Sequence, residues 1–131
     1  MKGNCQYAHN EVHESESKLI EEPEEALFEF DKFDWSRQLI KANELERCSP
    51  TLTVINENPG NFMGVSIYGE TNKEKFSSDC HFPGEVPSWF GIAKKKGTIT
   101  LRTYLFTRNE ARKAIELFIK EDYHGLKELY A

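Results

Sequence analysis

The clearest hydrophobic pattern in the chain lies near its C-terminus. Apolar positions recur there every three or four residues, at Ala111, Ala114, Ile115, Phe118 and Ile119. This spacing predicts an amphipathic helix. Thr107 and Glu110 precede it with the spacing of a capping box, in which each side chain satisfies a free amide of the first turn. We expect Gly125 to end this helix and a short apolar tail to dock after it: Leu126, Leu129 and Tyr130.

A second helical pattern covers residues 34–47. Asp34 is a suitable N-cap, because its carboxylate can accept from the free amides of the first turn, and Ser49-Pro50 stops the helix. The apolar positions fall near helical spacing at Trp35, Leu39, Ala42 and Leu45. The aromatic stretch that begins at Ala26 cannot stay in water. We expect it to be either an extended segment laid on the core or the lead-in to this helix.

Alternating apolar and polar positions predict four strands, at residues 51–56, 62–68, 74–82 and 98–106. The turn at 58–61 joins the first two as a hairpin. In the third strand one face should hold Phe76, Ser78, Cys80 and Phe82. In the fourth, one side should hold Ile99, Leu101 and Leu105.

Two connections between these strands are marked by turn-forming residues. Prolines and a glycine predict an irregular loop from Pro83 through Pro87 that carries Trp89 and Phe90. Residues 93–97 predict a turn with three lysines.

The order of the elements is therefore helix, four strands, helix. It predicts an α+β fold, an antiparallel four-stranded sheet with an N-terminal and a C-terminal helix packed on it. Residues 1–18 are polar with few apolar anchors, so we expect a flexible N-terminal arm. Residues 19–131 then form a single domain, which suits a chain of 131 residues.

Charge is distributed unevenly along the chain. The net charge is -5, but residues 11–34 alone hold ten acidic side chains against Lys18 and Lys32. Such a cluster projects a negative potential that attracts a cationic partner and repels nucleic acid. The alternative is a solvated acidic segment without a partner.

The chain carries no signal for export or for a membrane. Its N-terminus lacks an apolar core of the secretory type, and no run approaches the ~20 apolar residues that span a bilayer. The three cysteines, Cys5, Cys48 and Cys80, are odd in number and widely spaced, which argues against a secreted disulfide framework. We expect a cytoplasmic protein.

Motifs that would carry chemistry are missing. The sequence has no phosphate-binding loop and no nucleophile elbow. Adjacent Cys80 and His81 should point to opposite faces of a strand. Cys5, His9 and His13 could share a metal ion only on a helix, and the sequence around them has no helical pattern. We therefore expect no catalytic residues, no metal, no cofactor and no nucleic-acid partner.

Three segments give the chain a family resemblance: FDWSRQLIKANELERCSPTLTV (33–54), PGEVPSWFG (83–91) and RNEARKAIELFIKEDYHGLKELY (108–130). With them, the chain resembles the small bacterial immunity proteins that protect cells from polymorphic toxins, including those of contact-dependent growth inhibition. The resemblance covers residues 28–130 and leaves out the first 25. It implies an inhibitor that binds one cognate toxin C-terminal domain, often a nuclease, and blocks its active site.

The resemblance supplies no site residues, so the interface is predicted from charge. A nuclease is basic around its active site because it binds phosphates, and an acidic inhibitor can occupy that cleft. The expected charged contacts are Glu21, Glu22, Glu24, Glu25, Glu29, Asp31 and Asp34. The expected apolar anchors are Phe28, Phe30 and Trp35.

Two other functions stay open at this stage. One is a protein-interaction adaptor that uses the same acidic segment toward a partner other than a toxin. The other is a small enzyme that uses a cysteine and a histidine brought together by the fold.

Overall fold

A six-stranded antiparallel sheet forms the centre of the molecule, with the strand order β2-β1-β3-β4-β5-β6. The computed structural model describes residues 1–11, 14–46, 48–56, 61–87 and 94–131. The strands are β1 (Lys2–Gln6), β2 (Glu16–Leu19), β3 (Thr51–Ile55), β4 (Phe62–Tyr68), β5 (Lys75–Pro87) and β6 (Lys94–Phe106). The α+β class is confirmed, but the prediction of four strands is wrong.

The two additional strands come from residues 1–18, which we expected to form a flexible arm. β1 lies between β2 and β3, and Gly3 is opposite both Lys18 and Val54. A Cβ on Gly3 would lie 3.0 Å from Ile20 Cδ1, so the glycine lets this apolar side chain pack closely. These short polar strands are held mainly by main-chain pairing, which an apolar pattern does not reveal.

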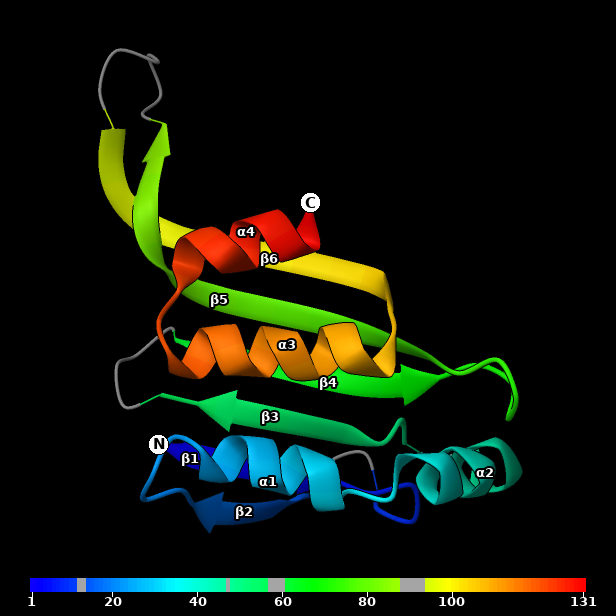
Figure 1. The fold of residues 1–131 in the computed structure, drawn as a ribbon. Coiled ribbons are helices and arrows are strands. Elements are labelled where there is room, and N and C mark those ends of the chain that lie inside the picture. The colour runs from blue at the N-terminus through cyan, green and yellow to red at the C-terminus, as the bar shows by residue number, and fades with distance from the viewer. Residues whose placement is uncertain (12–13, 47, 57–60, 88–93) are drawn as a thin grey trace.

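Four helices accompany the sheet: α1 (Glu25–Lys32), α2 (Trp35–Leu45), α3 (Arg108–Ile119) and α4 (Tyr123–Tyr130). Figure 1 shows α1, α3 and α4 on the same face of the sheet and α2 at one end. The aromatic stretch before Asp34 is neither extended nor merely the lead-in to α2: most of it forms the separate helix α1, which ends at Lys32. We call the opposite side, where the described residues place no helix, the open face.

The predicted caps of two helices are confirmed. The Asp34 side chain accepts from the Arg37 amide at the start of α2. Thr107 and Glu110 form the capping box of α3. The prediction that Gly125 ends the last helix is wrong, because α3 ends at Ile119 and Asp122 caps a separate helix. The Asp122 carboxylate accepts from the Gly125 amide at 2.9 Å, which places Gly125 in the first turn of α4.

The β5–β6 hairpin is longer than predicted. β5 continues through Pro87 and β6 begins at Lys94, so the expected irregular loop from Pro83 and the turn at 93–97 are wrong for the described residues. Within the described residues β4 pairs with β5 only up to His81, so beyond that point β5 pairs only with β6. Prolines are compatible with a strand that has one unpaired side, because they lack the amide hydrogen of a second ladder. Trp89 and Phe90 lie outside the described residues.

A bulge in β6 overturns one predicted orientation. Phe106 is opposite Phe76 and Thr103 is opposite Ser78, so Tyr104 and Leu105 together face Ser77. Leu105 is consequently 71% exposed instead of lying with Ile99 and Leu101, and Phe106 takes the inner position.

The core lies between the sheet and the helices. One side of each central strand is buried there, which confirms the predicted inner face of β5: Phe76, Ser78, Cys80 and Phe82. The predicted stripe of α3 packs on it through Ala111, Ala114, Ile115 and Phe118. No helix in the described part of the chain has the length and apolar character needed to cross a lipid bilayer.

Replacing Thr107 with alanine removes the oxygen that accepts from the Glu110 amide. We expect the free energy of unfolding in urea to fall by about 1 kcal/mol. Thr71→Ala, at an exposed turn position, is the control and should change it by less than about 0.5 kcal/mol. Equal losses in the two variants would contradict the capping role.

Candidate interaction surface

The predicted interface residues lie on α1, on the loop that leads into it and at the start of α2. The structure divides them into three groups: side chains in the core, carboxylates paired within the fold, and side chains that face solvent. Only the last group can contact a partner without rearrangement.

Two of the expected apolar anchors belong to the core. Phe30 and Trp35 are each 2% exposed, and the Trp35 indole Nε1 donates to the Phe30 carbonyl at 3.0 Å. Both rings pack against Phe76 of β5. These aromatic side chains therefore hold α1 and α2 to the sheet and are not available as surface anchors.

Glu29 is an acidic residue that the fold itself uses. It is 5% exposed, and its Oε1 accepts from Lys18 Nζ at 2.5 Å and lies 3.1 Å from Lys32 Nζ. Burial raises the pKa of Glu29, but the hydrogen bonds from the two lysines outweigh it, so the pKa lies below the ordinary value. This contact joins β2 to α1.

Asp31 and Asp34 also have partners within the fold. Both Asp31 oxygens accept from the Arg112 guanidinium at 2.8 Å, a bidentate pair between α1 and α3. The hydrogen bond from Arg112 lowers the pKa of Asp31. Asp34 is the N-cap of α2. Both carboxylates stay partly exposed, but each already accepts hydrogen bonds from groups within the protein.

The remaining candidates are neighbours in the chain, on the loop before α1 and on its first turns, and we call them the acidic corner. All are exposed except Glu25, which is half-buried. Within the described residues, no ion pair joins its four carboxylates to a basic side chain. Phe28 follows on the next turn of α1 and is 61% exposed, with Lys32 Nζ 5.6 Å from the centre of its ring. The acidic corner consists of Glu21, Glu22, Glu24, Glu25 and Phe28.

A hollow of about 480 Å³ adjoins the acidic corner. Figure 1 shows that the loop from β2 to α1 rounds the end of the sheet where β3 ends and β4 begins. The hollow lies at this end, and Glu21 belongs to both the hollow and the acidic corner. Its other lining residues are Met1, Leu19, Ile20, Pro23 and Asn56.

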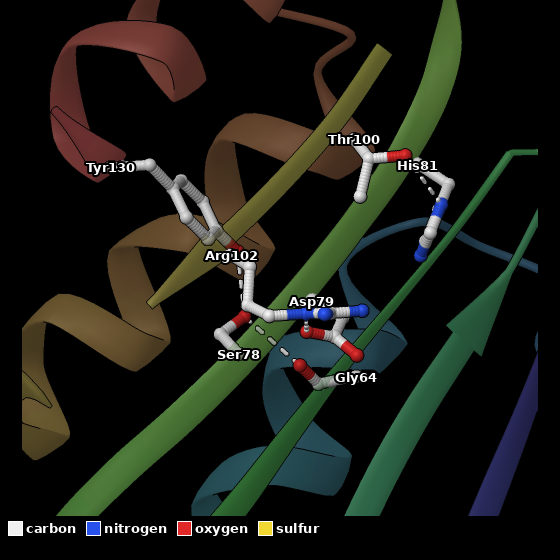
Figure 2. A network of polar contacts seen from close by, with 7 residues as sticks. All are labelled: Gly64, Ser78, Asp79, His81, Thr100, Arg102 and Tyr130. Carbon is white, nitrogen blue, oxygen red and sulfur yellow. Dashed lines mark hydrogen bonds and ion pairs between the residues drawn. The ribbon is translucent and has the colours of Figure 1, made fainter. Parts of the chain in front are cut away.

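The cysteine and histidine of β5 cannot act as a catalytic pair. Cys80 is fully buried among core side chains, and burial raises the pKa of its thiol to about 12. His81 points to the open face, where its ring stacks on Phe62 and its Nδ1 lies 3.2 Å from Thr100 Oγ1 (Figure 2). The opposite orientations predicted for Cys80 and His81 are confirmed.

The polar groups around Gly64 also serve the fold. Ser78 Oγ donates to the Gly64 carbonyl at 2.9 Å and lies 2.6 Å from the Tyr130 hydroxyl, while Arg102 Nε donates to Asp79 at 2.8 Å (Figure 2). Burial raises the pKa of Tyr130. A shallow hollow of about 270 Å³ lies over Gly64, lined largely by hydroxyl groups. None of these contacts places a nucleophile beside a base.

The other candidate sites gain no support. The described residues contain no group of three or more side chains able to hold a metal ion, and His13, one of the three positions weighed as ligands, lies outside them. Comparison with known proteins finds no matching family model, curated protein or solved structure. Any function must therefore be argued from the surface geometry.

Replacing Glu29 with glutamine removes the charge between the two lysines. At pH 7 we expect a loss of about 1–2 kcal/mol in the free energy of unfolding. Because the folded-state pKa of Glu29 is lowered, its contribution is present above the unfolded value near 4.5 and is lost as the pH falls through the folded value. The gap between the two proteins in urea unfolding should therefore narrow between pH 7 and pH 3.

The exposed Glu44→Gln is the matched control for this substitution. It should leave stability unchanged at both pH values. A gap between Glu29→Gln and the original protein that stays constant with pH would show that Glu29 does not act through its charge.

Proposed function

We propose that this protein is an immunity protein that neutralises a cognate toxin domain by binding it. The observation that carries the proposal is the acidic corner: four carboxylates that form no ion pair within the described residues, although Glu25 interacts electrostatically with Lys18, next to an aromatic ring that is 61% exposed. The Phe28 ring offers a partner an apolar surface to bury beside the carboxylates, and aromatic side chains are enriched among the residues that contribute most to binding.

The expected partner is a basic toxin domain, with a nuclease as the leading case. A nuclease active site presents cationic side chains to the phosphates of its substrate. The acidic corner offers carboxylates in place of those phosphates, and Phe28 offers an apolar contact that the phosphates lack. Opposite charges also accelerate the encounter, which is useful for an inhibitor that must act before the toxin does.

The direct test is co-expression with the toxin domain encoded beside this chain. We expect the cells to survive and the two proteins to elute together in size-exclusion chromatography. Continued killing without a complex would overturn the proposed function. Survival without a complex would point to an adaptor or an enzyme instead.

A fourfold charge reversal tests whether the acidic corner forms the interface. In the variant Glu21→Lys, Glu22→Lys, Glu24→Lys and Glu25→Lys, we expect association with the toxin domain to slow by about tenfold or more at low salt. Its salt dependence should also flatten. Stopped-flow or surface-binding kinetics at two ionic strengths measure both effects.

The matched control makes the same change in net charge at exposed acidic positions away from the acidic corner. It consists of Glu44→Lys, Glu46→Lys, Glu70→Lys and Glu121→Lys. This variant should associate more slowly only to the extent that the overall charge matters. Equal slowing in both variants would show that the acidic corner is not the contact surface.

A further inference from the structure

The strand register places a row of side chains across the open face at the end nearest the acidic corner. Residues directly opposite each other on neighbouring strands project to the same side of a sheet. Lys2 of β1 is opposite both Leu19 and Ile55. Ile55 is in turn opposite Phe62, and Phe62 is opposite His81. We call this series, from Leu19 to His81, the end row.

The end row places three apolar side chains on the open face. Leu19 is 63% exposed, Ile55 39% and Phe62 37%. The next row inward is polar, with Asn4 donating to Ser17 and Arg102 paired with Asp79. This polar row separates the end row from the other exposed apolar side chains near this face, Tyr104 and Leu105 of β6, which are 59% and 71% exposed.

The hollow connects the end row to the acidic corner. Leu19 belongs to the end row and lines the hollow, and Glu21, two residues further along the chain, lines the hollow and belongs to the acidic corner. Figure 1 shows the loop from β2 to α1 at the end of the sheet where β3 ends and β4 begins. The hollow and the apolar side chains of the end row lie at the same end. A partner that covers the acidic corner and the hollow therefore also meets Leu19 of the end row.

We infer that the toxin domain is held by a two-part surface, in which the acidic corner attracts it and the end row with its hollow receives an apolar side chain. This inference rests on the proposed function. The charge complementarity defines the partner chemistry: the partner carries an apolar or aromatic side chain flanked by cationic residues. Contacts of the apolar kind slow dissociation, whereas the carboxylates speed association.

Leu19→Asn tests the apolar part. Leu19 lies at the sheet edge and is largely exposed, so the fold should be retained. We expect dissociation of the toxin domain to be about tenfold faster, with the association rate and its salt dependence unchanged. Leu105→Asn is the matched control, because Leu105 is 71% exposed on the opposite edge strand, and it should bind like the original protein.

Lys2 supplies a test of opposite sign. It lies in the end row between Leu19 and Ile55, where a basic partner would meet a like charge. We therefore expect Lys2→Ala to associate about two- to fivefold faster at low salt. If the end row only stabilised the fold, Lys2→Ala would not associate faster than the original protein.

These experiments distinguish failure of the proposed function from failure of the two-part surface. If no complex forms with the original protein, the proposed function and this inference both fail. If the complex forms and the fourfold charge reversal weakens it, while Leu19→Asn and Lys2→Ala bind like the original, the inference alone is overturned. Equal effects of Leu19→Asn and Leu105→Asn would also overturn it.

Discussion

Burial of the sheet on one side only is the constraint on which the rest of the structure depends. Helices cover one face, so the inward-facing residues of β3, β4 and β5 are apolar except Ser78, whose hydroxyl is hydrogen-bonded, and the outward-facing residues can be polar. The same constraint draws Phe30 and Trp35 inward, because α1 and α2 need large side chains to fill the space above Phe76. Only residues whose side chains are not buried in the core can contact a partner.

Features of the fold that depend on residues close together in the chain could be predicted from the sequence. The Thr107 capping box, the Asp34 cap and the inner face of β5 follow from spacing alone. Features that depend on distant pairing could not be predicted in this way. β1 is a strand because β2 and β3 accept its main chain, and Leu105 faces outward because of a bulge opposite Ser77.

The candidate site shows the same division. Acidic composition marked this segment as a candidate, but it could not distinguish Glu29, which is buried between two lysines, from Glu21, which forms no ion pair within the described residues. The end row could not be predicted from the sequence because its members come from five strands, β1 to β5. The alternation that placed Met63, Val65 and Ile67 inside also placed Phe62 outside, and that aromatic residue was the available signal.

The candidate surface depends on the main-chain pairing of β1 as well as on its own side chains. β2 has no other neighbour in the sheet, so trimming of the first six residues by a protease would release β2. Lys18 would then leave Glu29, and Leu19 would no longer stand beside Ile55 across β1. Loss of these six residues would therefore take Met1 and Lys2 from the candidate surface and would also displace Leu19, which lies outside the trimmed residues.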